Sequence, residues 1–304
     1  GAEALLHLLQ VVIGRIHYPY ELEWMEGGML HQVLQVLQGE PLYGQPSLDF
    51  VPALYMPLYY YLSALSALVF GENLFALRLV SFIAVLVTNG FIFSITKKIT
   101  GSMLTAVLAV LFYALMFRHT GFWFDVARVD SLWTLLLAAS VYCLLLCKDA
   151  PTTKNILWLV RASVLAFFTK QATLFLLPFV LLTLWCWLGW RKALQFLLLC
   201  LPITLLLFLL CAALSGDKII FYTMQMASTH GITWFGVKRF LEIVIFSVPS
   251  FWLASIVFCV QIGKDTRDKI GWIALLAGFV FLSGLSRAYA GAFYNVLMPL
   301  YFCM

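Results

Sequence analysis

The chain is built from long apolar runs separated by short polar connections. A helix needs about 20 apolar residues to cross about 30 Å of hydrocarbon. Runs near that length occupy residues 2–17, 54–70, 75–96, 102–118, 130–147, 155–169, 172–190, 193–214, 241–262 and 270–286, and another begins at residue 295. The pattern predicts an all-α fold, a polytopic transmembrane helical bundle with about ten crossings in this chain.

The composition agrees with a membrane location. Of the 304 residues, 63% are hydrophobic and 11% are charged, and the mean hydropathy is +0.97. A soluble domain carries about 25% charged residues because its surface must be solvated. We therefore exclude a soluble globular protein and expect no nucleic-acid partner. All seven cysteines lie inside apolar runs, so we expect neither disulfides nor a thiolate metal site.

Basic residues cluster in alternate connections, as they do on the cytoplasmic side of membrane proteins. The clusters are Lys97 and Lys98; Lys148 and Lys154; Arg191 and Lys192; and Lys264, Arg267 and Lys269. Residues 18–53 carry acidic residues and no lysine or arginine, so they belong outside. If residues 54–70 crossed the membrane, this acidic segment would share a side with Lys97 and Lys98. We therefore predict that residues 53–70 form an interfacial helix in an outer loop of residues 18–74.

The outer loop contains a second predicted interfacial helix. Apolar residues recur at helical spacing over residues 29–37, polar residues take the other face, and Gly39 and Pro41 end the run. Residues 1–304 are expected to form a single transmembrane module. We expect further chain beyond both ends, because each end lies in or beside an apolar stretch.

Lys170 lies in an unusually tight turn. Residues 155–190 cross twice with only 36 positions, whereas two crossings ask for about 40. The turn is therefore expected below the membrane surface, where an ammonium group needs a cavity and an anion. The alternative is a lysine that extends its side chain to the headgroups.

Other polar residues gather in the outer connections. Glu23 and Glu26 would share a helix face, and either carboxylate could act as a general base or belong to a solvated acidic loop. Asp125 and Asp130 flank Arg128, although Asp130 could also belong to a helix N-cap region.

The outer cation Arg78 could hold a phosphate or anchor to lipid. His119 and His230 could complete a metal site with these acids, or make ordinary hydrogen bonds.

The order of these features resembles the GT-C superfamily of membrane glycosyltransferases, above all its protein O-mannosyltransferase and lipid A aminoarabinose transferase branch. That family has a first helix, an outer loop with an acidic motif, an interfacial helix ending in Phe-Gly, and a second helix that bears an arginine. The matching stretches are residues 23–28, 39–43, 56–61, 70–71, 77–81, 127–132, 168–171 and 294–299. One departure is that many members have Asp or Asp-Glu where this chain has Glu23 and Glu26.

The resemblance implies transfer of a sugar from a polyprenyl-phosphate carrier to an acceptor hydroxyl, with inversion. The acceptor would be a lipid, glycan or protein on the non-cytoplasmic side. The location implied is the bacterial inner (plasma) membrane, in a multi-pass protein whose active site faces outward. A transporter or flippase of lipid-linked sugars is the alternative, but the sequence shows none of the internal repeats that such proteins carry. A non-catalytic membrane scaffold is a further alternative, but it would not need paired acids and cations on one side of the membrane.

The expected site has a first-loop carboxylate as its base. We favour Glu26 over Glu23, because Gly27 and Gly28 let a sugar approach the backbone closely. Asp130 takes a supporting catalytic role. The expected substrate-binding residues are Arg78, Lys170, Arg128, Asp125, Tyr43, Tyr59, His230, Arg287, Tyr294 and Asn295. No cofactor is required by the sequence, but a divalent metal could bind at Glu23 and His119.

Overall fold

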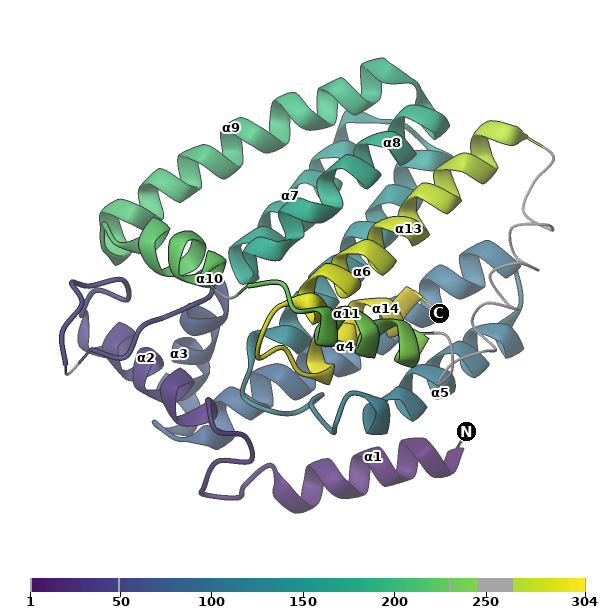
Figure 1. Cartoon of the computed structure of the whole chain (residues 1–304). Helices are drawn as coiled ribbons and strands as arrows, with labels where there is room; N and C mark the ends of the chain where they lie inside the picture. The colour runs from purple at the N-terminus through teal and green to yellow at the C-terminus, as the bar shows by residue number, and fades with distance from the viewer. Residues whose placement is uncertain (1, 49, 230, 245–264, 304) are drawn as a thin grey trace.

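The computed structural model describes residues 2–48, 50–229, 231–244 and 265–303. Every regular element in these ranges is a helix, and one isolated antiparallel bridge joins Ile232 and Tyr289. The predicted all-α fold is therefore confirmed (Figure 1).

The helices follow the predicted apolar runs closely. They are α1 (Ala2–Arg15), α2 (Glu26–Gln38), α3 (Leu58–Phe70), α4 (Leu74–Thr100), α5 (Met103–His119), α6 (Val129–Asp149), α7 (Thr153–Thr169), the 3-10 helix η1 (Gln171–Leu176), α8 (Leu177–Leu188), α9 (Trp190–Ser215), the π-helix η2 (Phe221–Gln225), α10 (Met226–Ser228), α11 (Trp234–Glu242), α13 (Thr266–Ala288), the 3-10 helix η4 (Tyr294–Leu297) and α14 (Met298–Cys303).

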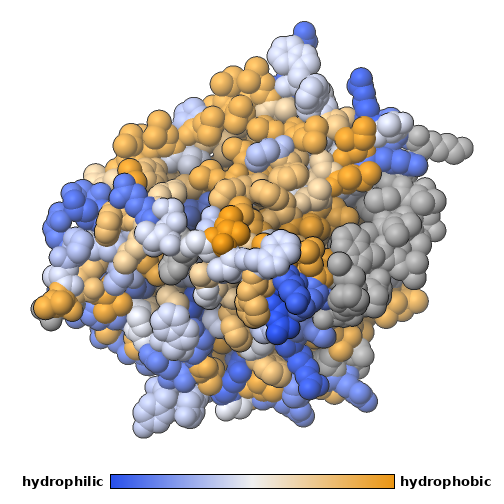
Figure 2. All heavy atoms as spheres, in the orientation of Figure 1, coloured by the Kyte–Doolittle hydropathy of each residue, from blue (hydrophilic) through white to orange (hydrophobic). Residues whose placement is uncertain are grey.

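Within the described residues, five helices are long and apolar enough to cross a membrane. They are Leu74–Thr100, Val129–Asp149, Gln171–Leu188, Trp190–Ser215 and Thr266–Ala288, and α1, α3 and α5 are shorter apolar helices. The predicted run 241–262 lies mostly outside the described residues, and the count of about ten crossings stays a prediction. Large side chains of α9, among them Leu198, Leu206 and Leu214, are exposed. The surface over α8 and α9 is accordingly hydrophobic, as a lipid-facing surface should be (Figure 2).

The two ends of the bundle differ in chemistry. At one end, ion pairs join Lys98 to Asp149 and Lys148 to Asp268. The basic connections after α4 and α6 and before α13 therefore meet on one side, as the charge pattern predicts. Helix α6 has 21 residues, a length of about 30 Å at 1.5 Å per residue. It leads from this basic end to the opposite end, where the acidic outer loop lies.

Helix α3 stays beside the first turns of α4. Its 13 residues span about 20 Å, too short for a straight crossing. The Tyr59 hydroxyl lies 3.1 Å from Ser81 Oγ, and the Ser66 hydroxyl donates to the Ala76 carbonyl at 2.8 Å. Tyr59 and Ser66, two turns apart on α3, thus bond near the start of α4, and the short length of α3 favours the interfacial interpretation. The predicted start at residue 53 is wrong, because the helix begins after Pro57, a residue that disfavours helix before itself.

Helix α2 ends as the sequence predicts. Gly39 has φ 73°, in the left-handed region that glycine adopts without strain. Its N–H donates to the Val36 carbonyl at 3.2 Å. The acidic loop therefore contains a partly buried helix that begins at Glu26 and ends at a glycine cap.

Candidate active site

Glu26, at the first position of α2, forms a fully buried ion pair with Arg78 of α4. Arg78 Nε and Nη2 donate to the Glu26 carboxylate at 3.0 and 2.6 Å. Both side chains have 0% exposure. The backbone N–H groups of Leu22 and Ala127 donate to the same carboxylate at 2.6 and 2.7 Å. Four donors thus occupy the Glu26 oxygens, which leaves no lone pair for a substrate proton.

The rest of the Arg78 guanidinium holds the backbone of the acidic loop. Its Nη1 donates to the carbonyls of Tyr18 at 2.6 Å and Arg15 at 3.4 Å, and its Nη2 donates to the Tyr20 carbonyl at 2.7 Å. A guanidinium has five N–H groups, and protein acceptors take all of them. The arrangement gives Arg78 a positioning role, in place of the phosphate contact expected from the sequence.

Glu23 differs from Glu26 because one of its oxygens has no partner. Its Oε2 accepts from Arg128 Nη1 at 2.9 Å and from the Met25 N–H at 3.2 Å. Its Oε1 is buried without a hydrogen-bond partner among the described residues. Burial raises the pKa of the Glu23 carboxyl above its usual value, although the neighbouring Arg128 opposes the shift. A carboxylate with a raised pKa and a free oxygen suits proton abstraction.

Arg128, the residue before α6, is surrounded by aromatic rings. Its Nη2 donates to the Tyr55 hydroxyl at 2.8 Å. Its guanidinium carbon lies 5.6 Å from the centre of the Tyr55 ring and 5.2 Å from that of Trp123. The Nε atom is buried and has no hydrogen-bond partner in the part of the chain described. Arg128 thus holds Glu23 and keeps one N–H unsatisfied.

Asp130 joins three segments that are far apart in the sequence. Its carboxylate accepts from Lys170 Nζ at the end of α7 and from Asn295 Nδ2 in η4, each at 2.8 Å. Lys170 Nζ also lies 4.6 Å from the centre of the Trp133 ring and 5.6 Å from that of Tyr55. Lys170 is buried in the protein, with Asp130 as the anion that a buried ammonium group requires, and the depth of its turn in a membrane stays a prediction.

An aromatic row extends from Arg128 toward the end of α13. The rings of Trp123 and Phe293 are 5.6 Å apart, and those of Phe293 and Tyr294 are 5.0 Å apart. Beyond them, the Arg287 guanidinium lies 5.9 Å from the Tyr294 ring centre. Arg287 is buried, its Nε has no hydrogen-bond partner, and no carboxylate of the described ranges forms an ion pair with it. A buried cation of this kind favours an anionic ligand.

Three expected site residues instead support the loops. The Tyr43 hydroxyl donates to the Tyr55 carbonyl at 2.7 Å, and that of Tyr59 bonds to α4. Asp125 accepts two hydrogen bonds from Arg15, at 2.9 and 2.5 Å, and Arg15 also donates to the Phe122 carbonyl. Phe122 has φ 65°, which is strained for a residue other than glycine, so the Arg15 contacts hold this turn in shape.

Of the two histidines expected at the site, only His119 lies in the described residues, and it does not join the cluster. His230 lies outside the described residues. His119 is exposed at the end of α5. In the described ranges, no three His, Cys, Asp or Glu side chains are grouped closely enough to hold a metal ion. The metal site suggested by Glu23 and His119 therefore gains no support.

Tyr55, Trp123 and Arg15 contact the site residues but were not among the predicted ones. The sequence predicts an interfacial helix that includes Tyr55, whereas this residue lies in the non-helical stretch before Pro57. The prolines at positions 52 and 57 were the available signal, since the residue before a proline favours extended backbone.

Comparison with known proteins identifies the family to which the chain belongs. The sequence profile of the dolichyl-phosphate-mannose-protein mannosyltransferase family matches residues 51–216, which is more than half of the chain. The chain belongs to this family, and the resemblance to the GT-C glycosyltransferases is confirmed.

Solved structures show the same fold. The crystal structure of ArnT from Cupriavidus metallidurans bound to undecaprenyl phosphate matches with a TM-score of 0.71 and 14% identity. Its apo structure matches with a TM-score of 0.66 and 14% identity. Each match covers 99% of this chain and 58% of the ArnT chain, so this sequence spans little more than half of that protein. No curated protein sequence matches the chain.

Proposed function

We propose that this chain carries the active site of a membrane glycosyltransferase that takes its sugar from a polyprenyl-phosphate carrier. Family membership and the fold of a protein that binds undecaprenyl phosphate support the class of donor. The observation that carries the chemistry is Glu23, a carboxylate with one oxygen held by Arg128 and the other without a partner among the described residues. The acceptor is a hydroxyl of a lipid, a glycan or a protein.

Glu23, in place of Glu26, is the proposed base. Its Oε1 takes the proton of the acceptor hydroxyl while the hydroxyl oxygen attacks the anomeric carbon. The bond between that carbon and the phosphate oxygen breaks, and polyprenyl phosphate leaves with the electron pair. Attack from the face opposite the phosphate inverts the anomeric carbon. A positioned base of this kind contributes about 10²–10⁴-fold to the rate.

The leaving phosphate needs positive charge more than it needs an acid. Arg287 supplies a buried guanidinium without a carboxylate partner in the described ranges, and Arg128 supplies an unsatisfied Nε. Lys170 is oriented by Asp130, and the described residues give its ammonium group one hydrogen bond out of three possible donors. Asn295 fixes the second Asp130 oxygen. Asp130 is therefore a positioning residue, and Arg287, Arg128 and Lys170 are the cations available to the carrier phosphate.

The active site faces the non-cytoplasmic side in this proposal. The Glu23 and Asp130 clusters lie at the acidic end of α4 and α6, and Lys98 and Lys148 lie at the basic end. The basic end belongs to the cytoplasm by the positive-inside rule. A bacterial inner membrane provides such a carrier and such a surface.

The direct test is donor turnover in proteoliposomes. The purified full-length protein is given a polyprenyl-phosphate sugar labelled in the sugar, together with lipid, glycan and peptide acceptors. Release of polyprenyl phosphate with label on one acceptor, in the inverted configuration, is expected. Movement of intact donor across the bilayer without release would support the transporter alternative and overturn the proposal.

A further inference from the structure

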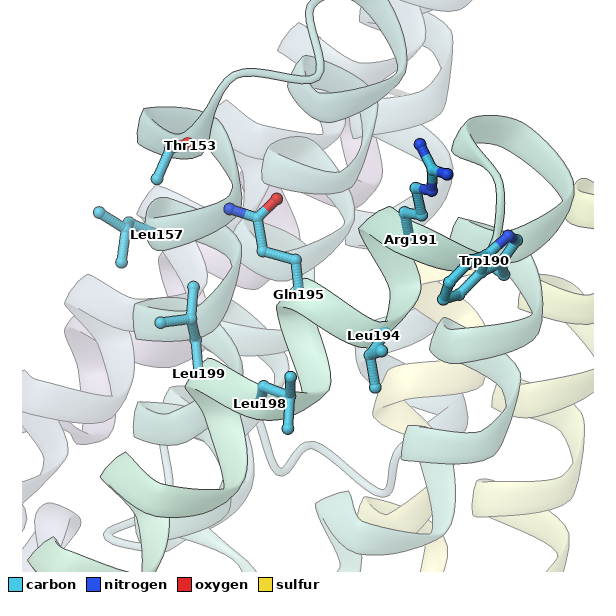
Figure 3. A pocket seen from close by; sticks show the side chains of 8 residues that line it. All are labelled: Thr153, Leu157, Trp190, Arg191, Leu194, Gln195, Leu198 and Leu199. Carbon is cyan, nitrogen blue, oxygen red and sulfur yellow. The ribbon is translucent and has the colours of Figure 1, made fainter.

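A shallow hollow lies between α7 and α9, at the end of the bundle opposite the candidate active site. Its volume is about 640 Å³, and the residues that line it are Thr153 and Leu157 of α7 and Trp190, Arg191, Leu194, Gln195, Leu198 and Leu199 of α9. Figure 3 shows the polar side chains Thr153, Gln195 and Arg191 at one end of the hollow and the leucines below them.

The hollow lies on the lipid-facing surface. In the most apolar window of α9 only 6% of residues are buried, and Leu194 and Leu198 are 41% and 62% exposed. Exposed leucines on a membrane helix contact acyl chains. The occupant of the apolar part must therefore come from the membrane.

The polar end of the hollow carries uncompensated positive charge. Arg191 is exposed, with its guanidinium 5.6 Å from the Trp190 ring centre. Lys192 donates to Gln195 Oε1 at 3.2 Å, and Lys154 follows Thr153 in the first turn of α7. None of these three cations forms an ion pair with a described acidic residue, whereas Lys98 and Lys148 at the same end do.

We propose that this hollow binds an anionic phospholipid of the leaflet at the basic end of the bundle. Arg191 contacts the headgroup phosphate, with Gln195 and Thr153 beside it, and an acyl chain lies along Leu194 and Leu198. Charge complementarity selects the anionic headgroup, because basic residues near the membrane surface attract anionic lipids. The bound lipid fills the gap between α7 and α9 and so holds the exposed α9 against the bundle.

Native mass spectrometry of the full chain tests the proposal. Protein in detergent is mixed with equal amounts of phosphatidylglycerol and phosphatidylcholine, and retained lipid is counted. The wild-type chain should retain phosphatidylglycerol several-fold over phosphatidylcholine. Arg191→Gln should bring the ratio close to one. The matched control Arg267→Gln, which removes an exposed arginine of the same end, should keep the preference.

A second variant separates the hollow from general surface charge. Leu198→Trp fills the hollow and leaves every cation in place, so it should also abolish the preference. Glycerol phosphate, which has the charge but no acyl chains, should not displace the retained lipid. Equal retention of both lipids by the wild-type chain would overturn the proposal. So would a preference that survives Leu198→Trp, or one that Arg267→Gln removes as fully as Arg191→Gln.

Discussion

Arg78 and Glu26 use all of their hydrogen-bonding groups on each other and on nearby backbone. Through this one pair, α4 holds the backbone of residues 15, 18, 20, 22 and 127. The acidic loop and the segment that carries Arg128 are thus fixed relative to each other. A fully satisfied buried pair of this kind positions a site and does not react within it.

Breaking this pair should unfold the outer loop. Removal of one partner from a buried ion pair costs about 3–5 kcal/mol, because the other charge is left unpaired. A lysine at position 78 would keep the charge but has three N–H donors, whereas the Arg78 guanidinium uses five. We therefore expect Glu26→Gln and Arg78→Lys to lower the melting temperature measured by thermal unfolding in detergent. Arg118→Lys, an exposed change on α5, is the control. Unchanged melting of Arg78→Lys together with lost donor binding would make Arg78 a phosphate ligand after all.

Glu23→Gln should abolish sugar transfer while the chain stays folded. The amide keeps a hydrogen-bond acceptor but cannot take a proton, so the rate should fall about 10²–10⁴-fold. Initial rates of polyprenyl phosphate release measure the effect, with the melting temperature as a check on folding. Glu40→Gln, an exposed carboxylate of the same loop, should retain full activity. A Glu23→Gln enzyme close to wild type would leave another group as the base.

The pH dependence of the transfer rate should change when the contact between Glu23 and Arg128 is removed. The base acts when ionised, so activity falls as the pH falls through the raised pKa of Glu23. Arg128 lowers that pKa. Arg128→Gln should therefore move the acid limb of kcat/KM to higher pH, whereas Arg118→Gln should leave it in place. An acid limb that does not move, or that moves to lower pH, would contradict the assignment of Glu23.

Arg287→Gln should weaken the use of donor. A charge-assisted contact contributes about 1.5–3 kcal/mol, which corresponds to about 10- to 160-fold in binding at 1.36 kcal/mol per factor of ten. The change should appear as a higher KM for the donor with a smaller change in the KM for the acceptor. An effect confined to the acceptor KM would move Arg287 to the acceptor side of the site.

The helices could be predicted from the sequence, because apolar runs of membrane length dictate them. The need of Lys170 for a nearby anion could also be predicted, since an ammonium group below the membrane surface is costly without one. Which cation pairs with which carboxylate could not be predicted from the sequence. Glu23 and Glu26 have the same side chain three residues apart, and only the fold brings Arg78 to one and Arg128 to the other. Long-range partners of that kind leave no local signal.

The two ends of the bundle should be exposed on opposite faces of the membrane. Gln45 lies in the acidic loop and Thr100 ends α4 beside the basic cluster, and both residues are exposed. In sealed right-side-out vesicles, an impermeant maleimide should label Gln45→Cys at once and Thr100→Cys only after permeabilisation. The unsubstituted chain, whose described cysteines are buried or half-buried, measures the background. The reverse pattern would place the active site in the cytoplasm. Equal labelling of both positions would mean that α4 does not separate the two faces and that this protein does not follow the positive-inside rule.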